Sequence, residues 1–196
     1  LNEDKNNKSA LIRKGRLYDF LEKYKLANEA LDLALKLYPN DAEVLMYRGR
    51  FYLYQEEFNR ALLELNHAIK IDSSYADAFH QRGRLFEKQE KFELALADYS
   101  KAIALEPENP ARYYYRAYLY ETLDEENKAF LDYSKAIELE PENAENWYDR
   151  GGFHDNYAND KGALDDLEQT LKIDPSYVDA INIIGVIYKE QGKIEL

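Results

Sequence analysis

Apolar residues recur every three or four positions in short segments of this chain, and polar turns separate the segments. Residues 76–88 and 92–105 are one example, with the turn 89–91 between them. Their apolar or small positions are Phe79, Leu85 and Phe86, followed by Leu94, Ala95, Tyr99, Ala102 and Ile103. This spacing indicates amphipathic helices rather than strands. Pro107 ends the second segment, because proline cannot continue a helix, so we predict a helical hairpin over residues 76–109.

The hairpin pattern repeats every 34 residues along most of the chain. The columns that carry the period are Gly15, Gly49, Gly83, Gly151 and Gly185; Ala27, Ala61, Ala95, Ala129 and Ala163; and Pro39, Pro107, Pro141 and Pro175. A fixed period of this length indicates stacked two-helix repeats rather than one closed globule. We predict an all-α fold of five complete repeats that start at residues 8, 42, 76, 110 and 144, followed by a first helix from residue 178.

Two further features of the repeat have a physical reading. Glycine inside a helix costs about 1 kcal/mol relative to alanine, so the glycine column predicts close approach by a neighbouring helix. Asp41, Asn109 and Asn143 stand just before first helices and are predicted to cap them, because their side chains can accept hydrogen bonds from free backbone N–H groups.

These columns resemble the tetratricopeptide repeat, which has small residues at positions 8, 20 and 27 and proline at position 32. Position 4 is aromatic or apolar in that family and reads Leu11, Leu45, Phe79, Tyr113, Trp147 and Ile181 here. The register places Trp147 in the core. The resemblance covers residues 8–196 and implies a right-handed α-solenoid that binds other proteins in a concave groove. Residues 1–7 lie outside it, as a polar tail or a lead into the first helix.

Composition narrows the choice of partner. The formal net charge of −12 argues against nucleic acid or an anionic membrane surface as the main partner. The chain has no cysteine and no apolar run of about 18 residues, so disulfides and a membrane-spanning helix are not expected. No secretory signal is visible; the compartment stays open, with the cytoplasm slightly favoured.

Charged residues at positions 7 and 23 occur together in four repeats. The pairs are Arg48 with Glu64, Arg82 with Asp98, Arg116 with Asp132, and Arg150 with Asp166. The first and sixth repeats lack such an arginine, so we predict an ion pair within each of the four repeats that fixes the packing of its two helices. Partner recognition by these arginines is the alternative.

The resemblance implies that positions 5 and 9 of each first helix face the groove. The candidate binding residues are Arg16, Arg50 and Arg84 in the first three repeats, and His80, Tyr114, Tyr118 and Tyr148. Arginines a repeat apart could hold carboxylates of an acidic peptide, and tyrosines offer rigid contact area. The alternative is local pairing, with Arg16 stacked on Phe20, Arg50 on Tyr54, and Arg84 beside Glu87.

No catalytic motif, cofactor loop or metal site is expected. His67, His80 and His154 occupy three different repeat positions, without the i, i+4 spacing of a metal site. His154 is expected to replace a packing aromatic residue. We therefore expect a non-catalytic scaffold for protein–protein interaction. A structural or self-association segment, or the regulatory arm of a longer protein, is the alternative function.

The sixth repeat stops early. Its first helix carries Ile183, Ile184 and Ile187, and only residues 194–196 begin a second helix. We expect either that the native chain continues or that another molecule covers this face. A homodimer through the C-terminal end would follow from the second case.

Overall fold

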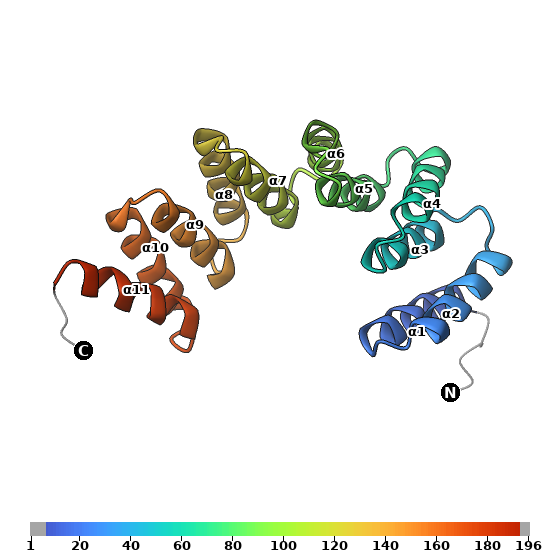
Figure 1. Ribbon diagram of the computed structural model, residues 1–196, viewed down its shortest axis with the longest axis horizontal. Helices are drawn as coiled ribbons and strands as arrows, with labels where there is room; N and C mark the ends of the chain where they lie inside the picture. Colours follow the sequence, from blue (N-terminus) through green and yellow to red (C-terminus); the bar gives the residue numbers. More distant parts are fainter. Residues whose placement is uncertain (1–6, 193–196) are drawn as a thin grey trace. The chain divides into compact units, whose positions relative to one another are not determined.

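The computed structural model describes residues 7–192, and this part of the chain is helical throughout, with no strand (Figure 1). Its helices are α1 (Lys8–Phe20), α2 (Tyr24–Leu37), α3 (Ala42–Tyr54), α4 (Phe58–Ile71), α5 (Ala76–Lys88), α6 (Phe92–Leu105), α7 (Pro110–Thr122), α8 (Glu126–Leu139), α9 (Ala144–Asn156), α10 (Asp160–Ile173) and α11 (Val178–Glu190). The predicted all-α class, a solenoid of helical repeats, is confirmed. The predicted start of a further helix at residues 194–196 lies outside the described residues.

Consecutive helices pack in pairs, α1 with α2 through to α9 with α10, and α11 packs against α10. The first helices begin at Lys8, Ala42, Ala76, Pro110, Ala144 and Val178, which are the residues at which the sequence period begins. The hairpins form two compact units. The N-terminal unit, residues 1–106, contains α1 to α6, and the C-terminal unit, residues 107–196, contains α7 to α11.

The core of the N-terminal unit forms along the seam between first and second helices. Leu31, Tyr52 and Leu65 are 2% exposed or less. A side chain at Gly49 would place its Cβ 2.7 Å from Leu65 Cγ, too close for any real contact. The glycine is therefore needed because the position-24 side chain of the second helix packs directly onto the first helix.

The C-terminal unit repeats this packing. Tyr133 of α8 and Phe153 of α9 are buried, with ring centroids 5.6 Å apart, and Leu167 of α10 packs against Ile187 of α11 in a second cluster. A Cβ at Gly151 would lie 2.9 Å from Leu167 Cγ. At Gly185 it would meet nothing within 4 Å. The predicted close approach therefore fails at Gly185, because no described helix follows α11 to supply a position-24 side chain.

The predicted caps hold the first helices in place. Asp41 Oδ1 accepts hydrogen bonds from the N–H groups of Glu43 and Val44 at 3.0 and 3.1 Å. Asn109 and Asn143 accept from Ala111 and Glu145 in the same way. Asn7 also caps a helix, because its Oδ1 accepts from Ala10 N at 3.2 Å. The rest of the predicted tail, residues 1–6, lies outside the described residues.

The turn inside each hairpin has a left-handed residue that is not glycine. Glu56 has φ of 58°; its N–H donates to Leu53 O, and the next N–H, of Glu57, donates to Tyr52 O. This is the Schellman arrangement that satisfies the last carbonyls of a helix. The equivalent residues, at position 15 of their repeats, are Glu22, Glu90, Asp124 and Ala158. The regular columns did not predict them, because glycine is the usual signal for this conformation.

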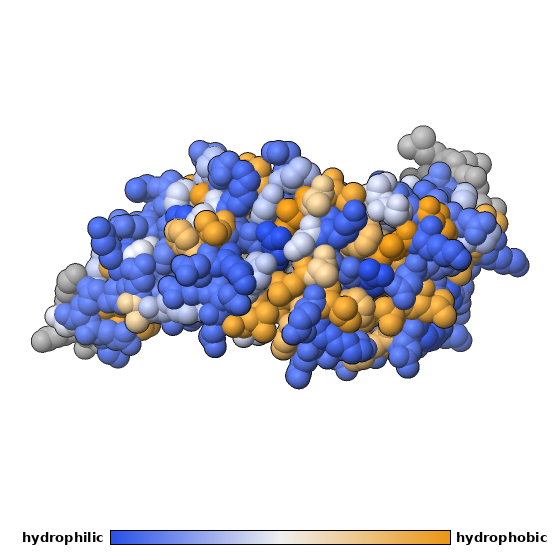
Figure 2. All heavy atoms as spheres, turned by 90° about the horizontal axis from the view of Figure 1, so that it is seen from above, coloured by the Kyte–Doolittle hydropathy of each residue, from blue (hydrophilic) through white to orange (hydrophobic). Residues whose placement is uncertain are grey.

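The surface is mostly polar, with separate apolar patches on the face drawn in Figure 2. Large apolar side chains stay exposed in both units, such as Leu63 at 64% and Leu131 at 66%. Trp147 is only half-buried, and its indole Nε1 donates to Pro141 O at 2.8 Å, so its placement in the core was wrong. No helix within residues 7–192 has the length and apolar composition needed to span a bilayer.

Candidate functional site

Each position-7 arginine lies in contact with the position-23 acid of its own repeat. Arg82 is typical, with Nε 2.7 Å from Asp98 Oδ2 and Nη2 2.8 Å from Asp98 Oδ1. The same two-pronged geometry joins Arg116 to Asp132 and Arg150 to Asp166. These three aspartates are at most 6% exposed. Removal of one partner would leave the charge of the other buried and unpaired, which would destabilise the fold.

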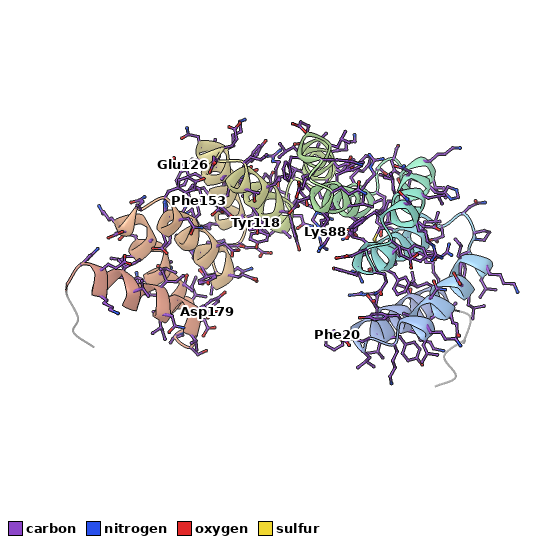
Figure 3. The ribbon with its side chains drawn as sticks, viewed as in Figure 1. Phe20, Lys88, Tyr118, Glu126, Phe153 and Asp179 are labelled. Carbon is purple, nitrogen blue, oxygen red and sulfur yellow. The ribbon has the colours of Figure 1, made fainter. Side chains whose placement is uncertain are left out.

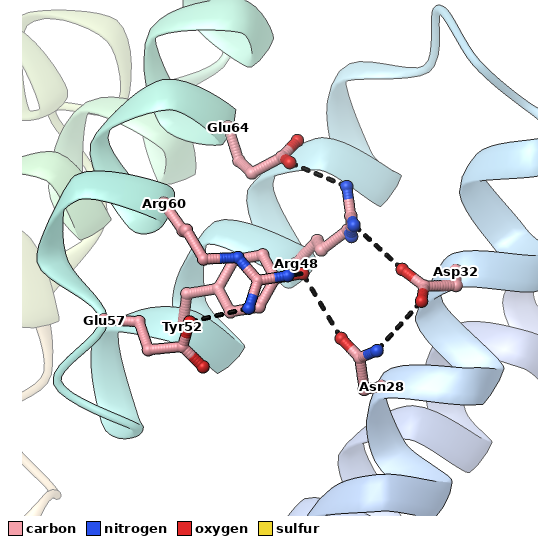
Figure 4. A network of polar contacts seen from close by, with 7 residues as sticks. All are labelled: Asn28, Asp32, Arg48, Tyr52, Glu57, Arg60 and Glu64. Atoms are coloured by element: carbon pink, nitrogen blue, oxygen red, sulfur yellow. Dashed lines mark hydrogen bonds and ion pairs between the residues drawn. The ribbon is translucent and has the colours of Figure 1, made fainter.

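The fourth arginine, Arg48, also reaches into the preceding repeat (Figure 4). Its Nη1 lies 2.7 Å from Glu64 Oε1 and its Nη2 2.8 Å from Asp32 Oδ1 of α2. Asp32 is at position 25 of its repeat, and the residue at that position in the preceding repeat also accepts a hydrogen bond from two other arginines. Arg82 donates to Asn66, and Arg150 donates to Ser134. These arginines tie neighbouring repeats together, a contact that the within-repeat pairing in the sequence did not predict.

A tyrosine extends this network in the N-terminal unit. Tyr52 Oη donates to Asn28 Oδ1 at 3.2 Å and accepts from Arg60 Nη2 at 2.5 Å (Figure 4). The guanidinium of Arg60 also stacks on the Tyr52 ring, 3.9 Å from its centroid. Burial raises the pKa of Tyr52, so its phenol stays neutral and able to donate. The network links α2, α3 and α4, and we assign it to repeat packing.

A second set of arginines stacks on tyrosines along the first helices of the N-terminal unit. We call Arg16, Tyr47, Arg50, Tyr54 and Arg84 the arginine–tyrosine column. The guanidinium carbons of Arg16 and Arg50 lie 5.4 and 4.9 Å from the Tyr47 ring centroid. Arg84 lies 5.4 Å from the Tyr54 centroid and donates to Tyr54 Oη at 3.0 Å. The column thus runs across α1, α3 and α5.

The local pairings expected for Arg16 and Arg50 occur only in part. Arg50 does lie over Tyr54, at 6.0 Å. Arg16 stacks on Tyr47 of the next repeat, and Arg84 on Tyr54 of the preceding one. Arg16 and Arg50 form no ion pair with any residue among 7–192, in contrast to the position-7 arginines. Their charges are therefore available to a ligand.

A pocket opens at the α1 end of the column. It has a volume of about 490 Å³, and its lining residues are Arg13, Arg16, Leu17, Asp19, Phe20, Arg50 and Tyr54. Phe20, the last residue of α1, is 83% exposed (Figure 3). Burial raises the pKa of Asp19, while Arg50 and a hydrogen bond from Gln55 act in the opposite direction. The sequence predicted Arg16 and Arg50 as binding residues but did not predict Leu17 or Arg13.

The candidate tyrosines of the C-terminal unit differ in accessibility. Tyr118 is 51% exposed, whereas Tyr114 packs against Tyr115, with ring centroids 5.2 Å apart. Tyr148 lies 4.8 Å from the Tyr177 ring. Burial raises the pKa of Tyr114 to about 12. Of the three predicted tyrosines, Tyr118 is therefore the most accessible to a ligand.

A second pocket, of about 310 Å³, lies in the same unit and is lined by residues that include Tyr114, Glu145 and Asp149. Burial raises the pKa of Asp149 to about 7, and the negative charges of Glu145 and Glu121 add to the effect. Sequence reasoning missed Asp149, because an aspartate on a repeat helix is indistinguishable from the many exposed acids until its surroundings are known.

Two histidines pack among aromatic residues. His80 was predicted to face a ligand, but it is 5% exposed, with its ring 5.6 Å from that of Tyr99, so that prediction was wrong. The bulky Tyr99 at position 24 covers it from the second helix. His154 lies against Phe130 and Phe153, as expected for a residue that replaces a packing aromatic. Burial lowers its pKa.

The predicted self-association residues of α11 need correction. Ile187 is 1% exposed, and Ile183 and Ile184 pack against the same core as Leu167. Only Ile187 is fully buried; Ile183 and Ile184 stay partly exposed. The exposed apolar residues of the helix are Val178 at 64%, Ile181 at 49% and Val186 at 54%.

Three solved structures show the same fold. YrrB, described as a TPR protein with an unusual peptide-binding site, is 20% identical, with a TM-score of 0.64 over 92% of this chain and 93% of that chain. A thermophilic TPR protein of Thermus thermophilus is 20% identical, with a TM-score of 0.74 over 92% and 98%. PilW, a type IV pilus biogenesis factor, is 20% identical, with a TM-score of 0.78 over 92% and 84%. No curated protein sequence matches the chain.

Sequence models of one family match the chain in three places. Tetratricopeptide repeat models match residues 12–76, 76–109 and 111–143. These segments include the position-7 arginines Arg48, Arg82 and Arg116 and most of the small-residue columns. The helical hairpins, their 34-residue spacing and these matches agree, and the chain belongs to the tetratricopeptide repeat family.

Proposed function

We propose that this protein is a non-catalytic interaction scaffold that binds an acidic peptide or protein segment along the arginine–tyrosine column. The observation that carries the proposal is the contrast between its two sets of arginines. Those at position 7 are paired with buried acids, whereas Arg16 and Arg50 stack on aromatic rings and form no ion pair with a described residue; Asp19 is the one acid that lines the pocket with them. Unpaired guanidinium groups on a chain of net charge −12 favour an anionic ligand.

The stacked rings also favour binding. An arginine that lies on a tyrosine face keeps its N–H donors free at the edge, so they can still form a fork with a carboxylate. The stacking restricts the long side chains before the ligand arrives, which lowers the entropy lost on binding. YrrB, with a similar fold, is described as having a peptide-binding site, which supports a peptide as the class of ligand.

The proposal is tested by fluorescence anisotropy with a labelled peptide rich in Asp and Glu. Arg50→Glu should weaken binding about tenfold, because an exposed charged contact is worth about 1 kcal/mol and reversal adds repulsion. Lys101→Glu, at an exposed position of α6, changes the net charge equally and should leave the affinity unchanged. Equal losses in the two variants would show a general charge effect and reject the column as the site.

A second candidate function is self-association through α11. The observation in its favour is the exposure of Val178, Ile181 and Val186 on one short helix. A contiguous patch of exposed apolar side chains can mark a contact surface. This reading is compatible with the first, since the column lies in the N-terminal unit and α11 in the C-terminal unit.

A further inference from the structure

We propose that the pocket at the α1 end of the column holds one large apolar side chain of the bound acidic segment, an inference that rests on the proposed function. The pocket has apolar walls at Leu17 and Phe20, which are 56% and 83% exposed. Burial of apolar surface contributes roughly 25 cal/mol of binding free energy per Å², so a large aromatic or aliphatic side chain of the ligand would gain most from this pocket. The two residues lie on adjacent turns of one helix, so they present a continuous apolar wall.

The rim of the pocket carries the charge that selects the rest of the ligand. Arg13, Arg16 and Arg50 line it, and none of them forms an ion pair with a residue that the structure describes. Asp19 is the opposing charge, and its Oδ1 already accepts a hydrogen bond from Gln55 Nε2 at 3.3 Å. Three guanidinium groups against one carboxylate leave a positive rim around an apolar wall.

This combination of surfaces indicates a mixed ligand. A purely acidic segment would leave Leu17 and Phe20 in water, and a purely apolar one would desolvate the arginines without pairing them. A segment in which a Phe- or Leu-sized side chain lies between Asp or Glu residues satisfies both. The ring of Tyr54, 47% exposed, adds a second aromatic surface to the same pocket.

Two labelled peptides of equal length and charge test the inference. One has a single Phe between acidic residues, and the other has Ser in its place. The wild-type protein should bind the Phe peptide about tenfold more tightly, the ratio expected for partial burial of one aromatic side chain. Phe20→Ser should remove that preference. Leu63→Ser, at an exposed position on α4, should keep the preference.

The outcomes separate the two proposals. Equal affinity for both peptides, with a loss in Arg50→Glu, would overturn the apolar anchor and leave the column as the site. Failure of both peptides to bind would overturn the proposed function and the anchor together. A protein dimer that disappears in Phe20→Ser would overturn the anchor by showing a second copy as the occupant, and tighter binding of a single-stranded oligonucleotide would do so by showing a nucleic acid.

Discussion

At the residue scale, the repeat pattern does not predict two features of this protein, which are a left-handed backbone conformation at Glu90 and a raised pKa at Asp149. Glu90, in the turn after α5, has φ of 57°, a left-handed conformation that costs a non-glycine residue about 1 kcal/mol. The pKa of Asp149 in the C-terminal unit is raised by burial and by the nearby acids Glu145 and Glu121. Both residues are tolerated because the packing around them fixes the backbone and the helix positions.

The first prediction at this scale concerns the hairpin turn. Glu90→Gly should raise the free energy of unfolding by about 0.5 to 1 kcal/mol, because glycine adopts the left-handed conformation without strain. The measurement is chemical denaturation with circular dichroism. Glu93→Gly, at an exposed site within α6, should lower stability by a similar amount. Destabilisation by both substitutions would show that Glu90 makes a contribution beyond its backbone.

The second prediction concerns Asp149. Its folded pKa of about 7 lies above the ordinary value of 3.8, so its stabilising contribution is complete below pH 3.8 and is lost as pH rises through 7. Asp149→Asn should therefore stabilise the protein by on the order of 3 kcal/mol at pH 8 and much less at pH 4. Asp155→Asn, exposed on the same helix, is the control for loss of one charge. An equal effect of Asp149→Asn at both pH values would contradict the assignment.

Helices are joined in this fold by a recurring polar contact beside the apolar seam. The position-7 arginine of a first helix pairs with the acid at position 23 of its second helix, and Arg48, Arg82 and Arg150 also reach the preceding repeat. The contact is made by two or three hydrogen bonds per arginine, so it fixes the angle between helices more strictly than apolar packing alone would.

Charge reversal tests this contact. Asp98→Arg should destabilise the protein by about 3 kcal/mol, because it leaves Arg82 facing a like charge in a buried site. The double variant Arg82→Asp/Asp98→Arg should recover part of that loss, since residues in contact couple. Glu138→Ala, which removes the exposed pair with Lys135, should change stability by less than about 0.5 kcal/mol. Additive losses in the double variant would argue against a direct pair.

The sequence predicted the first residue of every first helix, whereas several side-chain environments could not be predicted. Pro107 and the caps at Asp41 and Asn109 give local boundary signals that act before tertiary packing. The register also predicted acid partners for Arg82 and Arg116. Burial of His80 depends on the Tyr99 ring of another helix, and the partner of Arg16 is Tyr47 of the next repeat. Contacts of this kind join side chains of different helices, so they cannot be predicted from the spacing of residues along one helix.

At the scale of the whole molecule, the arginines fall into two groups, those paired with buried acids and those that line the pocket of the N-terminal unit. The chain carries a net charge of −12, yet unpaired arginines gather at one end of the N-terminal unit. In the C-terminal unit, Tyr118 of α7 and the apolar residues Val178, Ile181 and Val186 of α11 are exposed. The two units therefore present different chemistry to partners. Sequence reasoning found the arginine set but misjudged Ile187 of α11, because it expected the missing second helix to leave this residue exposed, whereas Ile187 packs in the same cluster as Leu167 of α10.

The oligomeric state tests the α11 surface. If the exposed residues drive association, wild-type protein should show a mass that rises with concentration in analytical ultracentrifugation. Ile181→Glu/Val186→Glu should make it monomeric without loss of helix content, because both side chains are 49% exposed or more. Leu131→Glu, similarly exposed on α8, is the control. A wild-type protein that stays monomeric at high concentration would remove self-association as a function.

The central claim is that the arginine–tyrosine column binds an acidic segment, and the most direct measurement is its affinity as a function of salt. The dissociation constant of an acidic peptide should rise steadily with sodium chloride for the wild-type protein, because screening weakens exposed charges. In Arg16→Gln/Arg50→Gln, which retains the polar side chains but not the charges, affinity at low salt should fall about tenfold or more. The salt dependence should flatten as well. A double variant that binds with wild-type affinity and the same salt dependence would contradict the account.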